Sequence, residues 1–175
     1  SVVFDQARAP SSWTLPSGRS SISGRQPERW DAGPHLGQVL GEAGWATIAV
    51  VTNSYMTETF GMVEGWGTHQ SNMGIRADHE VLRALQWVED YADRDLMLWL
   101  HLIDPHLPYT EATEFRSIWA RESPEQLEGP VNAKTVAAAW TACETDAQRQ
   151  ELSDYLWDRY DQNIRAADAA LKPIL

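Results

Sequence analysis

Two apolar runs with a helical pattern between them restrict the possible folds of this chain more than any other feature. Residues 45–51 and 96–103 are continuous in apolar side chains, a pattern typical of strands buried on both faces. Apolar residues recur at spacings of three and four over residues 75–92, which predicts an amphipathic helix. A glycine-rich stretch at 61–67 is predicted to be a loop. Strands that alternate with helices favour a mostly parallel sheet with helices on both faces, so the predicted fold class is α/β.

Further helices are predicted on either side of these runs. A loop leads into a short helix that starts near Pro16 and stops at Gly24, because proline is favoured in a first helical turn and glycine beyond the last one. A second helix is expected over 34–43, and apolar spacing predicts helices at 133–143 and 147–171. A chain of 175 residues can bury one substantial core, so a single domain is expected.

Charge and hydropathy exclude two classes of protein. The chain has 25 acidic and 14 basic residues, a net charge of −11, which argues against a nucleic-acid partner. No apolar run of about 18 residues exists, so no membrane span is predicted. Residues 1–33 hold four arginines against three acids, the one segment suited to an anionic substrate. The single cysteine, Cys143, excludes an internal disulfide and a thiolate metal site.

Candidate functional residues follow from where parallel sheets carry their sites. In parallel sheets, functional residues lie mainly at the carboxyl ends of the strands. Asn53 follows the first apolar run, and His106 follows the second. Thr14 stands just ahead of the first predicted helix. We therefore expect Thr14, Asn53 and His106 to converge at the carboxyl edge of one sheet.

Thr14 is the candidate nucleophile. A hydroxyl just ahead of a helix lies near unpaired backbone N–H groups and the positive end of the helix dipole, which both favour negative charge. A nucleophile that attacks a phosphoryl or sulfuryl group would be placed there, with the N–H groups holding the anionic oxygens. The alternative is that Thr14 or Ser12 simply caps the helix.

The histidines divide into one candidate and four others. His106 lies between Pro105 and Pro108, in a stiff loop that fixes the imidazole, where it can donate to an anionic oxygen or act as an acid. The alternative is an ordinary loop histidine that hydrogen-bonds a backbone carbonyl. His101, within the second apolar run, is expected to be a hydrogen-bonded core residue. Three more show no ligand spacing and are expected at the surface: His35, His69 and His79.

Five motifs then follow one another in order along the chain. They are residues 12–17 (SWTLPS) with 20–27 (SSISGRQP), 36–53, 65–67 (GWG), 99–109 (WLHLIDPHLPY) and 160–168. Together they resemble the sulfatases of the alkaline phosphatase superfamily and their phosphoryl-transferring relatives. The resemblance spans the whole chain and implies an alkaline phosphatase/sulfatase-like fold.

The resemblance also implies roles for particular residues. Thr14 takes the position of the nucleophile, where it would also bind a divalent metal (Ca, Mg, Mn or Zn). His106 takes the position of a histidine that contacts the sulfate or phosphate. Arg19 and Asn53 are assigned to substrate binding, although Gly18 stands where the family often has arginine. A threonine cannot be oxidised to formylglycine, which sulfatases proper form from cysteine or serine.

The implied function is hydrolysis or transfer of a sulfate or phosphate ester by a metal-activated threonine. The substrate would be a small molecule or a glycan. The family's first strand carries an acidic pair ahead of the position of Ser1, and an Asp-His or Asp-Asn motif follows that of Leu175. We therefore expect a partial catalytic domain, incomplete at both ends, that is inactive alone and binds metal weakly. The alternatives are a non-catalytic domain of this type, used for binding or assembly, and an α/β domain of unrelated function.

Overall fold

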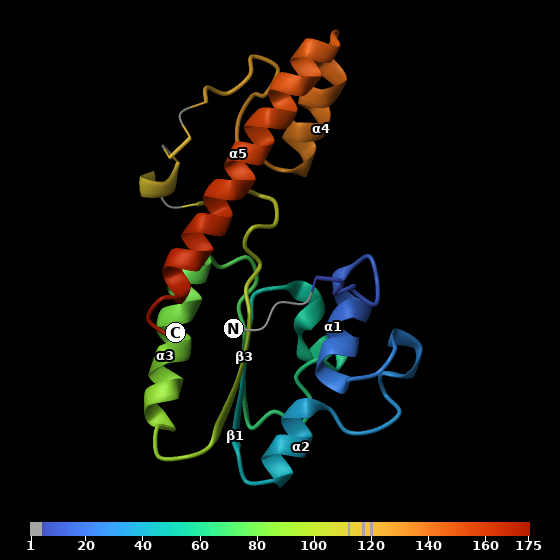
Figure 1. The fold of residues 1–175 in the computed structure, drawn as a ribbon, viewed down its shortest axis with the longest axis vertical. Helices are drawn as coiled ribbons and strands as arrows, with labels where there is room; N and C mark the ends of the chain where they lie inside the picture. Colours follow the sequence, from blue (N-terminus) through green and yellow to red (C-terminus); the bar gives the residue numbers. More distant parts are fainter. Residues whose placement is uncertain (1–4, 112, 117, 120) are drawn as a thin grey trace. The chain divides into compact units, whose positions relative to one another are not determined.

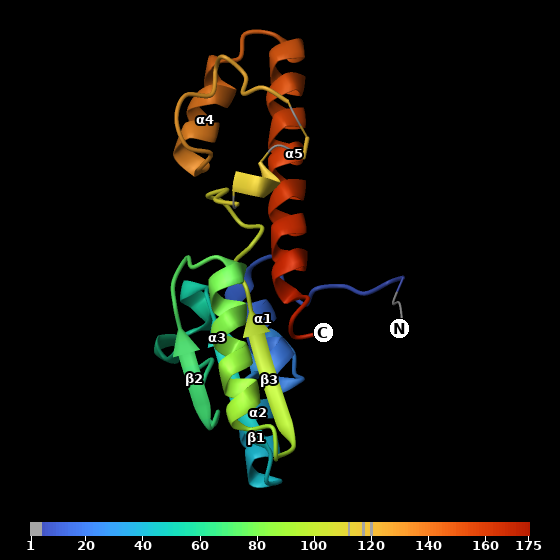
Figure 2. The same ribbon diagram turned by 90° about the vertical axis from the view of Figure 1, so that its left-hand side faces the viewer.

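A computed structural model describes residues 5–111, 113–116, 118–119 and 121–175. These residues form two compact units rather than one (Figures 1 and 2). The first comprises the chain up to Gly74 together with Ala84–His101, and the second comprises Ile75–Arg83 and Leu102–Leu175. Each unit has its own buried apolar cluster. No helix among the described residues is long and apolar enough to cross a bilayer.

The first unit is built on a three-stranded parallel sheet. Its strands are β1 (Ala46–Val51), β2 (Thr68–Ser71) and β3 (Leu96–His101), in the order β2-β1-β3. All six residues of the central strand β1 are buried. The predicted α/β class with a parallel sheet is confirmed at this level.

Two strand predictions need correction. The four polar residues of β2 lie just beyond the predicted glycine-rich loop, and they pair with Ile48–Val51. This pairing is made by the backbone, so the polar side chains gave no sign of it. The side chains of β3 are half-buried, not fully buried, because in the described part of the chain β3 has a neighbour on one side alone.

Helices lie on both faces of this sheet. α1 (Thr14–Ser23) and α2 (Leu36–Glu42) lie on one face, and residues 84–90 of α3 (Ala77–Asp90) lie on the other (Figure 1). Leu15 and Ile22 of α1 pack in one cluster with Val51 of β1. Gly24 ends α1 with φ 65°, a conformation that favours glycine, as the sequence predicted.

The second unit contains the two predicted C-terminal helices. They are α4 (Ala133–Ala142) and α5 (Asp146–Leu171), and both begin with a capping box, formed by Asn132 and Thr145 respectively. Their shared core consists of six buried residues: Leu127, Val131, Ala139, Cys143, Leu152 and Tyr155.

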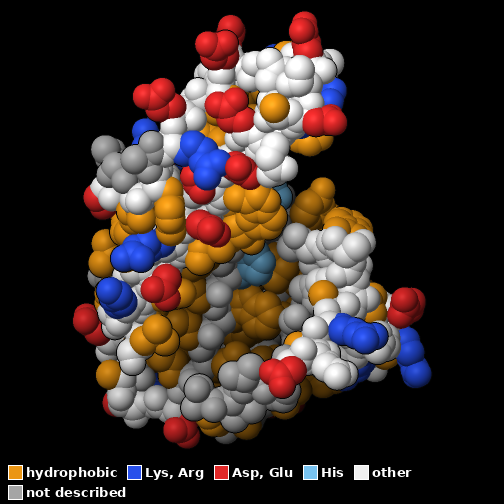
Figure 3. Space-filling view, turned by 45° about the horizontal axis from the view of Figure 1, so that its top comes forward, with side chains coloured by type: hydrophobic (Ala, Val, Ile, Leu, Met, Phe, Trp, Pro, Cys, Tyr) orange, Lys and Arg blue, Asp and Glu red, His pale blue; other side chains and the backbone are white. Residues whose placement is uncertain are grey.

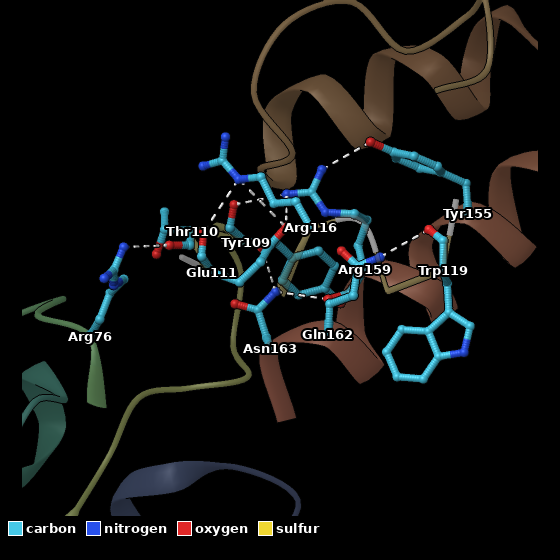
Figure 4. Close-up of polar contacts among 10 residues, drawn as sticks. All are labelled: Arg76, Tyr109, Thr110, Glu111, Arg116, Trp119, Tyr155, Arg159, Gln162 and Asn163. Atoms are coloured by element: carbon cyan, nitrogen blue, oxygen red, sulfur yellow. Dashed lines mark hydrogen bonds and ion pairs between the residues drawn. The ribbon is translucent and has the colours of Figure 1, made fainter. Parts of the chain in front are cut away.

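A buried charge network fixes the chain after β3 on α5. The carboxylate of Glu111 is fully buried, and its Oε1 lies 2.6 Å from Nη2 of Arg159 (Figure 4). Asn163 Nδ2 donates to Glu111 Oε2 at 2.8 Å. Arg116 lies farther away, with Nε 3.9 Å from Oε1, and is mostly exposed. Glu111 is therefore neutralised mainly by Arg159.

We predict that Arg159→Met lowers the free energy of unfolding by about 3 to 5 kcal/mol, because it leaves the Glu111 carboxylate buried without its main partner. Arg116→Met is the matched control and should cost less than about 1 kcal/mol, since that pair is longer and exposed. Urea unfolding of both variants checks this. Equal losses would contradict the assignment of Arg159 as the main partner.

Candidate functional site at the carboxyl end of β1

The first turn of α1 lies beside the carboxyl end of β1. Leu15 packs with Val51, the last residue of the strand. The ring of Trp13 contacts that of Tyr55 edge-on, with centroids 5.5 Å apart. Thr14 stands between Trp13 and Leu15, and Asn53 lies two residues before Tyr55. The structure therefore brings Thr14 and Asn53 to the same edge of the sheet.

The N-terminus of α1 differs from those of α4 and α5. Its N-cap residue is Trp13, no side chain caps it, and its first turn contains no acidic residue. In α4 and α5 a side chain of the N-cap residue accepts hydrogen bonds from the first turn. The first N–H groups of α1, those of Thr14 and Leu15, have no intrahelical partner. This end of α1 is therefore open to an anion, in contrast to the alternative in which Thr14 or Ser12 caps the helix.

Asn53 and Arg19 already bind other parts of the protein. Asn53 is buried, and its Oδ1 accepts the N–H of Tyr55 at 2.9 Å. Arg19 Nη2 donates to the carbonyl of Phe60 at 3.2 Å, and its guanidinium lies 4.2 Å from the centre of the Trp30 ring. Both side chains hold the loops that surround the site. An anion bound by Arg19 would compete with these two contacts.

Gly18 has no room for a side chain. A Cβ at this position would lie 2.5 Å from Sδ of Met56, well inside contact distance. Met56 itself is buried in the cluster of Leu15 and Val51. An arginine at position 18 would require Met56 to move, so the glycine suits the close approach of α1 to the chain that follows β1.

His101 is a residue of the candidate site that the sequence did not single out. It pairs with Val51 in the parallel register, so its side chain is on the same face as Val51, against which α1 packs. Its Nδ1 is buried and has no hydrogen-bond partner among the described residues, so the expected hydrogen bonding is not met at this atom. Burial lowers the pKa of His101. Its place at the carboxyl end of an apolar run was the signal that could have identified it.

His106 belongs to the second unit. Its side chain is exposed, and Nδ1 lies 2.6 Å from the carbonyl oxygen of Leu107. This is the geometry of the alternative in which a loop histidine bonds a backbone carbonyl. Nearby in sequence, Asp104 accepts the N–H of Ala77 at 3.0 Å, and burial raises the pKa of the Asp104 carboxyl. Asp104 therefore holds the start of α3.

The other three histidines divide between the surface and the interior. His69 and His79 are exposed, as predicted. His35 is buried and stacks on Trp30, with ring centroids 5.0 Å apart, so its predicted surface position was wrong. Trp30 is thus held between His35 and the guanidinium of Arg19.

The described residues do not form a metal site by themselves. In the ranges that the structure describes, no group of three or more His, Cys, Asp or Glu side chains is placed to hold an ion. The hydroxyl of Thr14 would be a single ligand, whereas divalent ions in proteins take four or more. No reaction step is therefore assigned to a metal.

Comparison with known proteins adds nothing to the description of the site. Searches of protein-family models, curated proteins and solved structures found no match to this chain. The resemblance to sulfatases therefore stays a prediction from the motifs. In the structure, Thr14, Asn53 and His101 lie at one edge of the sheet.

We predict that His101 makes stability fall in mild acid. Its pKa in the folded state lies below the ordinary value of 6.5, so the unfolded state binds the proton more readily. The stability that depends on a neutral His101 is present above pH 6.5 and is lost as the pH falls. The loss is at most about 1.4 kcal/mol per pH unit. His101→Gln should lose less stability than the wild type between pH 7.5 and pH 5.

Urea unfolding at several pH values measures this difference. His69→Gln, on an exposed position of β2, is the control and should follow the wild type. A His101→Gln curve parallel to the wild type would show that this imidazole does not titrate differently on folding.

Proposed function

We propose that the first unit binds the anionic group of a phosphate or sulfate ester at the N-terminus of α1 and that Thr14 attacks its central atom. One observation carries this proposal: the uncapped start of α1 stands at the carboxyl end of β1 with a threonine as its first residue. In α/β proteins, ligands bind at this edge of the sheet. Unpaired N–H groups and the helix dipole favour the negative oxygens of such a group.

Thr14 and His101 would share the proton chemistry. Thr14 Oγ1 forms a bond to phosphorus or sulfur while the bond to the ester oxygen breaks, and the leaving alkoxide takes a proton from water. The hydroxyl proton of Thr14 passes to His101, whose lowered pKa keeps it neutral and able to accept. Water or an acceptor alcohol then attacks the phosphorus or sulfur atom, the bond to Thr14 Oγ1 breaks, and Oγ1 takes back the proton from His101.

The remaining predicted residues would bind substrate. Asn53 lies at the same edge as Thr14, and Arg19 is five residues along α1, where it would reach an anion by leaving Trp30. His106 belongs to the second unit, and its predicted contact with a sulfate or phosphate rests on the resemblance alone. A divalent metal, implied by the resemblance, would need ligands other than the described residues.

A non-catalytic binding domain is the second candidate. The contacts of Asn53 with Tyr55 and of Arg19 with Phe60 and Trp30 favour it, since both side chains already have protein partners. Such a domain would bind the anion at α1 without turning an ester over. Activity, not anion binding, separates the two candidates.

We predict that inorganic phosphate binds at α1. In an NMR titration, the amide signals of Thr14 and Leu15 should shift with phosphate, because their N–H groups have no intrahelical partner at the open end of the helix. The amides in the first turn of α5 are the internal control and should stay in place, since Thr145 caps them. Equal shifts at both helices would indicate a general effect of ionic strength. The absence of a shift at α1 would contradict the proposal.

For a form of the protein with esterase activity, we predict a higher kcat/KM on phosphate esters than on sulfate esters. A sulfated formylglycine hydrate expels sulfate through its second hydroxyl, which threonine lacks, so an esterified Thr14 must wait for attack by water or alcohol. Thr14→Ser should retain activity, and Thr14→Ala should lose several orders of magnitude in kcat/KM. Values of kcat/KM on matched aryl esters test this. A clear preference for sulfate, or an active Thr14→Ala variant, would reject Thr14 as nucleophile.

A further inference from the structure

The second unit carries an exposed groove lined by aromatic side chains. We call it the aromatic groove, and its volume is about 280 Å³. Two tryptophans are unusually exposed in it, Trp140 at 49% and Trp157 at 61%. Six residues line the groove: Tyr109, Trp140, Ser153, Leu156, Trp157 and Tyr160. Tryptophans exposed to this extent lose contact with water when a ligand covers them, which favours binding.

The groove is built on the rigid part of the unit. Its four residues from α5 lie at spacings of three and four, so they share one face of that helix. Leu156 and Tyr109 also pack against the core of the unit, and Tyr109 N–H donates to the carbonyl of Val131 at 3.0 Å. α4 contributes Trp140 from the other side. The walls are therefore in place before a ligand arrives.

The aromatic planes stand at steep angles to one another. The rings of Trp157 and Tyr160 have centroids 5.8 Å apart and planes at 88°. Those of Tyr109 and Tyr160 have centroids 6.4 Å apart and planes at 59°. Rings at such angles surround a space instead of forming one flat surface. A compact, rounded group fits such a space better than the flat face of a sugar.

Charge around the aromatic groove favours a cation. The second unit has 15 acidic and 9 basic side chains, and no lysine or arginine lines the groove. Acidic side chains stand out over the end of the unit where α4 and the start of α5 lie (Figure 3). Asp161, one turn beyond Trp157, is exposed and forms no ion pair within the described part of the chain. By contrast, Arg121 lies 2.8 Å from both Asp154 and Asp158.

We propose that the aromatic groove binds the trimethylammonium group of a small molecule. The faces of indole and phenol rings attract a cation, most strongly for tryptophan. No carboxylate lines the groove to accept hydrogen bonds from a primary ammonium. A trimethylammonium group has no N–H to satisfy and presents an apolar, positively charged surface. This inference does not depend on the proposed function of Thr14.

The test uses choline chloride as the cationic probe and 3,3-dimethylbutan-1-ol as its uncharged isostere. Choline should perturb the indole NMR signals of Trp140 and Trp157, and the isostere should bind at least about fivefold more weakly. Trp157→Leu should weaken choline binding by a similar factor, whereas Trp157→Phe should retain most of it. Trp45→Leu, in the first unit, is the control and should bind as the wild type does.

Four results would overturn the inference. They are equal binding of choline and its isostere, no binding of choline, binding of glucose in its place, and a concentration-dependent dimer that covers Trp157. Circular dichroism melting of each variant checks its folding. Because Trp140 and Trp157 are about half exposed or more, their replacement does not disturb the core, and Trp140→Leu provides an independent second variant.

Discussion

The double pairing of β1 is the constraint on which the first unit depends. Its six buried residues form backbone hydrogen bonds to β2 on one side and β3 on the other. Its apolar side chains point to both faces of the sheet, and Val51 packs with Leu15 of α1. A strand buried in this way must have all its backbone groups paired, so it needs a neighbouring strand on each side.

The register of β1 with β3 decides which side chains meet at the candidate site. Because the strands are parallel and Val51 lies opposite His101, the two side chains share a face and an edge. α1 packs on this face through Leu15, which brings the open start of the helix to the same edge. The proposed nucleophile and proton acceptor, Thr14 and His101, are therefore gathered by backbone pairing and by packing.

The second unit is organised by a different interaction. Glu111 is fully buried and depends on Arg159 and Asn163, which lie one turn apart on α5. This ties the chain after β3 to the helix. The same helix also carries Trp157 and Tyr160 of the aromatic groove. One long helix thus provides both the internal network and the external binding surface.

The sequence by itself determined the local elements and part of the site. Apolar spacing and caps predicted α1 to α5, and continuous apolar runs predicted β1 and β3, because these patterns act within a few residues of one another. The rule of strand ends also selected Asn53, and the predicted helix start selected Thr14. Only the tertiary structure decided that β2 exists, that Arg19 binds Trp30, and that His101 keeps a ring nitrogen unpartnered among the described residues. These features arise from backbone pairing and from contacts between residues distant in sequence, which no local pattern records.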